Sequence, residues 1–231
     1  FRSTSEWCGH GPILEEDIAL TNIALDLIGE ANLLLQRAGQ VEGKGRDQDA
    51  LAYLRIDREF RNVLMVEQPR GDFGHTIVRQ FLFGTYALHQ WEALTSCADA
   101  DLAGIAAKAV KESRYHVRHA GEWLARLGDG TDESHARTQD ALDDLWRYTG
   151  ELFMTDAVEQ ELVKQKLAVD SSTLEAAWKR DVAEAIARAT LRLPADGYMQ
   201  RGGRSGLHSE HLGHMLAEMQ VLPRTHPGAT W

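Results

Sequence analysis

The sequence has 231 residues, of which 43% are hydrophobic and 26% are charged, and its formal net charge is −10. This length suits a single domain with a buried core, and the apolar fraction excludes a chain that is disordered throughout. The acidic balance argues against nucleic-acid binding, which needs clustered Lys and Arg to contact phosphates. Cys8 and Cys97 form neither a disulfide framework nor a Cys-x-x-Cys pair, so we expect a reducing, cytoplasmic location.

The sequence gives no sign of a membrane span or a signal peptide. We find no apolar run that approaches the ~18 residues a span needs, and residues 1–6 lack the pattern of a signal peptide. We therefore expect no membrane partner. Because the sequence starts at Phe1 and not at Met, we also expect that an N-terminal helix is truncated there.

The first long helix is predicted over residues 13–38. Its apolar residues leave almost no polar face, which is typical of a helix that other helices surround, so we place it centrally in a bundle. A Gly-rich link over residues 39–45 leads to a shorter amphipathic helix over residues 49–65. The sequence Pro69-Arg70-Gly71 then breaks the helical pattern.

Further helices fill the rest of the chain. Asp72 is suited to cap a helix over residues 73–96, and the next helix covers residues 101–127. Thr131 or Asp132 caps a fifth helix, which ends at about residue 153. The remaining predicted helices cover residues 155–166, 172–190 and 208–222, and residues 194–206 form an irregular stretch. With no strand-period pattern and no repeat, the sequence predicts one all-α domain, residues 1–231, built as a helical bundle.

Polar residues interrupt the predicted apolar stripes at a few positions. Glu30 shares a face with leucines of the first long helix, and Ser113 and His116 lie at i and i+3 on the stripe of residues 101–127. Glu6 ends a helix that leads to the same region. Di-iron carboxylate bundles use one carboxylate from each of two helices and a Glu-x-x-His pair from each of the other two. Because Glu6, Glu30 and His116 are acids and a histidine expected to face the interior of the bundle, we compare their spacing with that of a di-iron site.

The sequence does not meet the requirement of a di-iron site. Ser113 stands where the acid before His116 is needed, and Glu112 lies one position away from the required spacing. Asp72 and His75 have the spacing but lie at a helix start, where Asp72 is better used as a cap. We interpret these side chains as buried structural groups with partners, and keep a working metal site as the alternative.

Several long sequence phrases are more specific than the helix pattern. They are residues 6–10 (EWCGH), 16–20 (EDIAL), 64–69 (LMVEQP), 111–116 (KESRYH), 123–128 (WLARLG) and 208–213 (HSEHLG). Through these phrases, essentially the whole chain resembles the C-subunit family of bacterial phenylacetyl-CoA epoxidase, a multicomponent oxygenase of aerobic phenylacetate degradation.

The resemblance implies a ferritin-like bundle with additional C-terminal helices that pairs with a related catalytic A subunit. That subunit is expected to hold the di-iron centre and to bind the substrate. The assembly would insert one atom of dioxygen across the aromatic ring of phenylacetyl-CoA, with electrons from a separate reductase. The C-subunit family is implied to serve as a non-catalytic structural partner of the A subunit and of the other epoxidase subunits. Alone, such a chain could form a homodimer.

Carried over residue by residue, the di-iron ligand pattern of the catalytic subunit falls on six positions of this chain. The first glutamate is retained, the first Glu-x-x-His pair has become Leu and Glu, the third-helix carboxylate has become Gly, and the second pair keeps only its imidazole. The resemblance therefore implies no catalytic, cofactor-binding or metal-binding residue here and places the di-iron cofactor in the partner. The six vestigial positions are Glu6, Leu27, Glu30, Gly84, Ser113 and His116.

Two hypotheses follow for the interior of the bundle. In the first, Glu6, Glu30 and His116 hydrogen-bond to one another in place of the metal ions, because isolated buried charges are costly. In the alternative, the chain is an autonomous ferritin-like metalloenzyme that uses the same three residues as atypical ligands.

Two groups outside the interior also have the chemistry of a binding site. His208, His211 and His214 recur every third residue, but steps of three drift ~60° around a helix, so the three do not converge on one ion. We interpret them as a helix end where two subunits meet. Basic residues of two loops could meet the phosphates of a CoA ester, although solvated loop charge explains them as well. These residues are Lys44, Arg46, Arg201 and Arg204.

Overall fold

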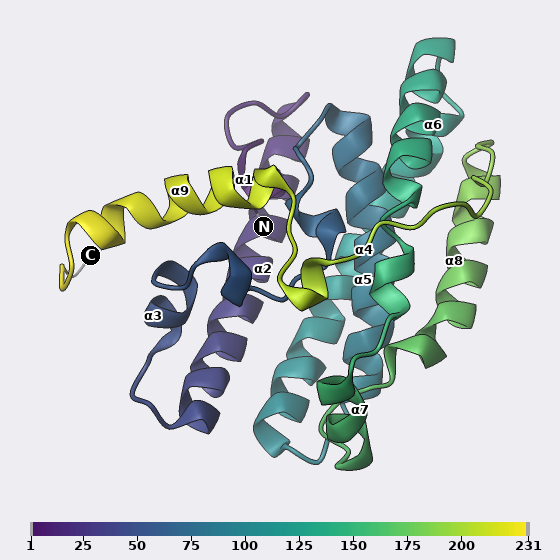
Figure 1. The fold of residues 1–231 in the computed structure, drawn as a ribbon. Coiled ribbons are helices and arrows are strands. Elements are labelled where there is room, and N and C mark those ends of the chain that lie inside the picture. The colour runs from purple at the N-terminus through teal and green to yellow at the C-terminus, as the bar shows by residue number, and fades with distance from the viewer. Residues whose placement is uncertain (1, 230–231) are drawn as a thin grey trace.

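The computed structural model describes residues 2–229, so that Phe1, Thr230 and Trp231 lie outside the described residues. Over the described range the chain is all-α, with no strand, and its long helices form a ferritin-like bundle (Figure 1). The fold class expected from the sequence is confirmed. The principal helices are α2 (Leu14–Glu42), α4 (Phe73–Leu94), α5 (Ala100–Gly128), α6 (Asp132–Trp146) and α8 (Glu175–Arg188).

The hydrophobic core lies between α4, α5, α6 and α8. Trp178 of α8 is only 1% exposed, and its ring centroid lies 5.2 Å from that of Phe153 and 5.7 Å from that of Trp146. Its indole N–H donates a hydrogen bond of 2.9 Å to the carbonyl oxygen of Leu82 in α4. Complete burial of a large apolar side chain stabilises a fold by about 1.5–3 kcal/mol. This aromatic cluster therefore fixes α8 and the chain after α6 against α4.

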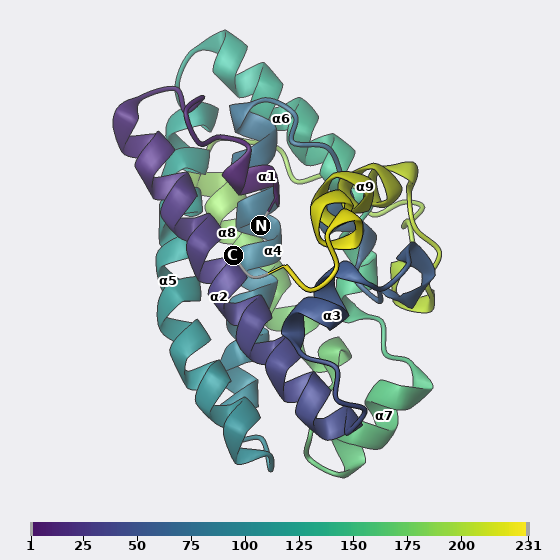
Figure 2. The same ribbon diagram turned by 90° about the vertical axis from the view of Figure 1, so that its left-hand side faces the viewer.

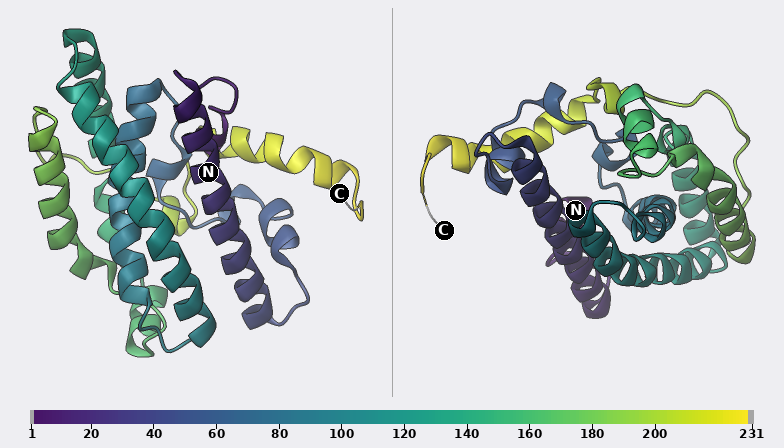
Figure 3. Two further views of the ribbon diagram at one scale, coloured as in Figure 1. Left: turned by 180° about the vertical axis from the view of Figure 1, so that it is seen from behind. Right: turned by 90° about the horizontal axis from the view of Figure 1, so that it is seen from below.

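The position of α2 corrects the sequence-based prediction of a central helix. Leu14 is 71% exposed, Ile18 is 53% exposed and Leu25 is 60% exposed. Figures 2 and 3 show why, because α2 lies at the edge of the bundle beside α5. An apolar sequence indicates that a helix prefers to be buried, but it does not show whether its own chain or another molecule buries it.

The composition of α2 also corrects the expectation about apolar runs. An 18-residue window of this helix reaches a mean hydropathy of 1.5, and 28% of the window is buried. By length and composition alone, α2 meets the criterion for a helix that could cross a membrane. Hydrogen bonds from His116 and His119 of α5 to the carboxylates of Asp26 and Glu16 hold this helix against the bundle.

The helix predicted over residues 49–65 begins where expected but is much shorter than predicted. The structure has a short helix α3 (Gln48–Tyr53), followed by 3₁₀ turns at Asp57–Glu59 and Leu64–Glu67. The carboxylate of Glu59 accepts a hydrogen bond of 2.8 Å from the backbone N–H of Ile56. This bond belongs to the 3₁₀ turn at Asp57–Glu59, which stands where the predicted helix would have continued.

The C-terminal part of the chain wraps around the bundle. Beyond α6, which ends at Trp146 and not at residue 153, a 3₁₀ turn at Gly150–Phe153 leads to α7 (Ala157–Lys164). The final helix α9 (Glu210–Thr225) starts two residues later than predicted and includes Pro223 in its last turns. Figure 1 shows that α9 extends outward beside α3. At the other end of the chain, α1 (Arg2–Ser5) is a single turn.

Candidate functional site

One cavity collects five of the six vestigial positions. It has a volume of about 230 Å³ and lies between α2, α4 and α5. Leu27 and Glu30 come from α2, Gly84 from α4, and Ser113 and His116 from α5, where a spacing of three places them on one face. Five of the positions that the resemblance singled out therefore line one cavity, whereas Glu6 does not. The apolar part of the wall consists of Ala31, Leu34, Phe83, Ala87 and Trp91.

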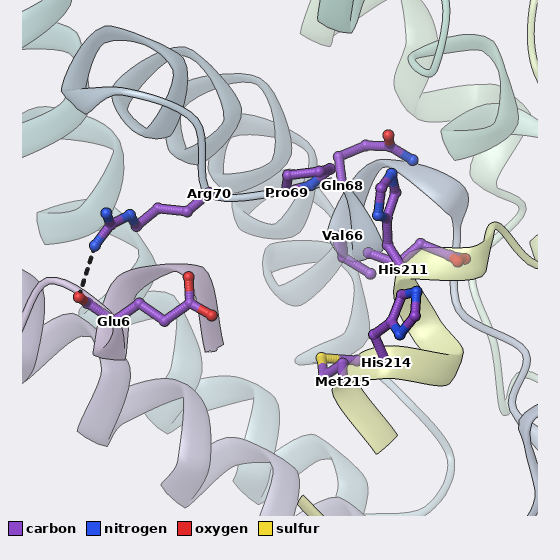
Figure 4. Close-up of a pocket in the computed structure, with 9 residues that line it drawn as sticks. Glu6, Val66, Gln68, Pro69, Arg70, His211, His214 and Met215 are labelled. Carbon is purple, nitrogen blue, oxygen red and sulfur yellow. Dashed lines mark hydrogen bonds between the residues drawn. The ribbon is translucent and has the colours of Figure 1, made fainter. Parts of the chain in front are cut away.

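Glu6 lies apart from this group and lines a second pocket, of about 200 Å³. Figure 4 shows the guanidinium group of Arg70 donating to the backbone carbonyl oxygen of Glu6, at 2.8 Å. The same guanidinium lies 4.5 Å from the ring centroid of Trp7. His211 and His214 of α9 line the opposite side of this pocket. The expected set of three hydrogen-bonded residues is thus divided between two pockets.

His116 has a partner that the sequence did not identify. Its Nε2 atom lies 3.0 Å from Oδ2 of Asp26, and the two side chains are 5% and 33% exposed. This contact replaces the expected bond to Glu30 or Glu6, and that hypothesis is corrected accordingly. The imidazole therefore connects α5 to α2 through its Nε2 atom.

Glu30 is the exceptional group of the cavity. The residue is 8% exposed, and its Oε1 atom is buried with no hydrogen-bond partner among the described residues. Burial, reinforced by the negative charges of Glu112 and Asp26, raises the pKa of Glu30 from 4.5 to about 7. Near neutral pH this carboxyl group is therefore protonated in a large fraction of molecules and can donate or accept a hydrogen bond.

A second carboxylate next to the cavity is only partly neutralised. Lys108 places its Nζ atom 3.0 Å from Oε1 of Glu112, one turn away on α5. The other oxygen of Glu112, Oε2, is buried and has no partner among the described residues. The acids of this region thus repel one another, which accounts for part of the raised pKa of Glu30.

The side chains around the cavity do not fit a di-iron centre. Leu27 and Gly84 offer no donor atom, and Ser113 offers a hydroxyl group where a carboxylate is needed. Two irons need four carboxylates and two imidazoles in such a bundle. Among residues 2–229, no group of three or more His, Cys, Asp or Glu side chains has the arrangement to hold a metal ion. The arrangement can bind or release a proton, but it lacks the ligands to hold two metal ions.

The sequence analysis missed the carboxylates that pair with the α5 histidines. Besides Asp26, Glu16 of α2 lies 2.8 Å from Nε2 of His119, and both side chains are about one-tenth exposed. A signal was present, because His119 follows His116 by three residues and Asp26 precedes Glu30 by four. The partners are 90 and 103 residues apart in sequence, so spacing alone could not connect them.

The three histidines near α9 do not act together. Nδ1 of His208 lies 3.0 Å from the buried carboxylate of Glu67, and its Nε2 lies 3.0 Å from the carbonyl oxygen of Phe60. His211 and His214 face the pocket beside Glu6 instead. The three imidazoles therefore have different neighbours, and the expectation that they share no metal ion stays a prediction.

Most of the basic loop residues have acidic neighbours. Arg46 pairs with Glu42, and Nη1 of Arg204 lies 2.8 Å from Oε2 of Glu159. Arg201 lines an open hollow of about 660 Å³ together with Arg204. Because Glu159 neutralises Arg204, these contacts favour the interpretation as loop charge over a phosphate site.

Comparison with known proteins gives one consistent result. The sequence profile of the family described as phenylacetic acid catabolic protein matches residues 2–231, a range that includes every helix described above. The chain is also 48% identical over 226 residues to the C subunit of the 1,2-phenylacetyl-CoA epoxidase of Escherichia coli (strain K12), a match that covers 98% of this chain and 91% of that protein. The chain therefore belongs to the phenylacetic acid catabolic protein family.

Proposed function

We propose that this chain is the non-catalytic structural subunit of a multicomponent phenylacetyl-CoA epoxidase. In this role it packs against the di-iron catalytic subunit and holds that subunit in its active shape. The observation that carries the proposal is the cavity between α2, α4 and α5. The resemblance assigns to this cavity the position of the di-iron site, and Leu27, Gly84 and Ser113 stand there in place of carboxylates.

The similarity to a named relative supports the same conclusion. By its name, the Escherichia coli protein is the C subunit of an epoxidase, so it is one part of a larger enzyme. Identity of 48% over 98% of the chain supports transfer of that role to the present protein. Its expected partners are the catalytic subunit and the other epoxidase subunits, and we place the assembly in the cytoplasm.

Reconstitution tests the proposal directly. The catalytic subunit and reductase from the same organism are assayed for oxidation of phenylacetyl-CoA with and without this chain, and the soluble amount of catalytic subunit is measured in parallel. We expect a loss of at least tenfold in activity, in solubility or in both when this chain is omitted. Unchanged activity and solubility would contradict a structural role.

Metal analysis distinguishes this proposal from an autonomous metalloenzyme. Glu6 and His116 are the ligand types that the resemblance retains, and the alternative adds Glu30 as an atypical third ligand. We expect well under one iron per chain after purification from iron-supplemented cells. About two irons per chain, together with dioxygen-dependent absorption bands, would establish the alternative instead.

A further inference from the structure

Three acids lie together where α2 contacts α5, and two of them have a basic partner. Oδ2 of Asp26 lies 3.0 Å from Nε2 of His116, and Oε1 of Glu112 lies 3.0 Å from Nζ of Lys108. The third acid, Glu30, is 8% exposed, and its Oε1 atom is buried with no hydrogen-bond partner among the described residues. A buried acid without a partner is costly, so this position lacks a donor, and a positively charged donor would serve best.

Glu30 and Glu112 lie at the same level of the two helices. Figure 2 shows α2 and α5 side by side, and the two helices run in opposite directions. Glu30 follows Asp26 by about one turn of α2. Glu112 likewise precedes His116 by about one turn of α5, so the contact between Asp26 and His116 brings the two glutamates level. Oε2 of Glu112 is also buried without a partner among the described residues, so two carboxylate oxygens lack donors at one level of the bundle.

The cavity beside Glu30 has the size and the walls of a small-molecule site. Its volume of about 230 Å³ exceeds the volume of about 150 Å³ at which an apolar cavity can hold benzene. There is thus room for one ring with a short substituent. The apolar lining residues are only partly buried, so a solute can enter from solvent without unfolding of the chain. These residues are Leu27, Ala31, Leu34, Phe83, Ala87 and Trp91.

The polar groups of the wall do not supply a charged donor for Glu30. They are Gln80, Gln90, Ser113 and His116, and no lysine or arginine among residues 2–229 lines the cavity. Water is a poor substitute, because a buried water needs about two to four polar partners and much of this wall is hydrocarbon. Glu30 therefore faces a cavity with room for a ligand that brings its own donor.

The charges around Glu30 favour a cationic ligand. Burial, and then the negative charges of Glu112 and Asp26, raise the pKa of Glu30 to about 7. Lys108 opposes this effect without cancelling it. A negative ligand would increase the repulsion, and a neutral ligand would leave it in place. An ammonium group reduces the repulsion, supplies three N–H donors and is attracted to the face of an aromatic ring such as that of Trp91.

From these observations we propose that the cavity between α2, α4 and α5 binds a small organic ammonium ion. The ammonium group donates to the carboxylate of Glu30, and a ring or a short apolar body packs against Phe83 and Trp91. Glu30 binds the ligand in its ionised form, so that a molecule that starts with Glu30 protonated releases one proton to solvent. The inference does not depend on the proposed function, because the cavity belongs to this chain alone.

Benzylamine is a suitable probe because it joins one ring to one ammonium group, and benzyl alcohol is its uncharged counterpart of nearly the same shape. Binding to the purified chain at pH 8 is measured by titration calorimetry and by the rise in melting temperature that a ligand of the folded state produces. We expect one saturable site with at least tenfold higher affinity for benzylamine than for benzyl alcohol. Toluene, which lacks the charge, and methylammonium, which lacks the ring, should each bind at least tenfold more weakly than benzylamine.

Two variants separate the charge from the cavity. Glu30→Gln keeps the shape and removes the charge, so it should weaken benzylamine binding at least tenfold and change benzyl alcohol binding less than threefold. Gly84→Leu fills the cavity and should weaken both. A Cβ atom on Gly84 would lie 3.6 Å from Cγ2 of Val117, an ordinary contact, so this variant should fold, which circular dichroism checks. The control Glu184→Gln makes the same change of net charge at an exposed site and should keep both affinities within twofold.

The pH dependence of binding is a further readout. Because the pKa of Glu30 is about 7, its ionised fraction falls about tenfold from pH 8 to pH 6, and the affinity for benzylamine should fall by the same factor. The other titratable groups around Glu30 come from α2 and α5, since the α4 residues that line the cavity are uncharged. These groups are Asp26, Lys108, Glu112 and His116. Glu30→Gln leaves all four in place and should remove the pH dependence.

Four results would overturn the assignment. If the wild-type chain shows no saturable binding of benzylamine at millimolar concentration, the cavity holds only water. Equal affinity for toluene or benzyl alcohol would indicate a site for neutral molecules. Equal affinity for methylammonium, or displacement of benzylamine by Mg²⁺, would indicate a site for small or inorganic cations. Binding that Glu30→Gln leaves intact would place the site elsewhere. None of these results bears on the role in an epoxidase, which reconstitution tests separately.

Discussion

Asp26 and His116 form a contact across the α2–α5 interface, with 3.0 Å between Oδ2 and Nε2. The two residues are 90 positions apart and connect the edge helix to the centre of the bundle. Because several large apolar side chains of α2 are exposed, polar contacts such as this one help to hold the helix against the bundle.

We expect a measurable coupling between Asp26 and His116. In a double-mutant cycle with Asp26→Asn and His116→Gln, the coupling free energy should be about 1–2 kcal/mol, because a buried histidine loses its acceptor. Urea unfolding of the four proteins measures it. The control Asp140→Asn, at an exposed site of α6, should change stability by less than about 0.5 kcal/mol. Additive effects of the two substitutions would mean that the contact contributes nothing.

Glu30 should make the stability of the isolated chain depend on pH. Its pKa is about 7 in the folded state and 4.5 in the unfolded state, so the folded state holds more protons between these values. Stability therefore falls as pH rises from about 4.5 to 7 and stays reduced above that range, by at most about 3 kcal/mol. The cause is burial first, and then repulsion by Glu112 and Asp26.

The substitution Glu30→Gln isolates this effect. The amide cannot ionise, so the variant should be more stable than the wild type at pH 8 and should lose that advantage at pH 4.5. Thermal unfolding at both pH values measures the difference. Glu184→Gln, at an exposed site on α8, serves as the control and should show no such pH dependence. An equal gain at both pH values would argue against a raised pKa for Glu30.

The sequence predicted the cavity better than it predicted the position of α2. Glu30, Ser113 and His116 were found because each interrupts an apolar stripe at helical spacing, and periodicity determines which side chains share a face. The partners of these groups were not predictable, because the pairing of α2 with α5 depends on contacts between distant parts of the chain. The apolar composition of α2 was misread for a related reason, since hydropathy does not distinguish a core from a surface that another protein covers.

Glu67 illustrates a site that propensity rules overlook. Its carboxylate is fully buried and accepts hydrogen bonds from the backbone N–H of Ser209 at 2.9 Å and the Ser209 hydroxyl at 2.8 Å, while Nδ1 of His208 lies 3.0 Å away. The sequence around it reads as the end of a helix. Its function is to attach the start of α9 to the loop after α3.

Removal of that carboxylate should release α9 while the bundle stays folded. For Glu67→Ala we expect amide hydrogen exchange in residues 207–225 to rise at least tenfold, and the melting temperature to fall, because several buried donors lose their acceptor. Hydrogen-exchange mass spectrometry measures the change. Glu210→Ala removes an exposed acid of the same segment and should leave the exchange within about twofold. Unchanged protection of α9 in Glu67→Ala would show that other contacts hold it.

Two glycines of α5 should respond to alanine with opposite signs. A Cβ atom on Gly128 would lie 2.1 Å from the carbonyl oxygen of Ala189, where α5 meets the end of α8, whereas one on Gly104 would meet nothing within 4 Å. Gly128→Ala must push α8 away and should cost about 1–3 kcal/mol. Gly104→Ala, exposed in the same helix, should stabilise the protein by about 0.5–1 kcal/mol through helix propensity. Urea unfolding of both variants measures the contrast, and a neutral Gly128→Ala would contradict the tight contact between the two helices.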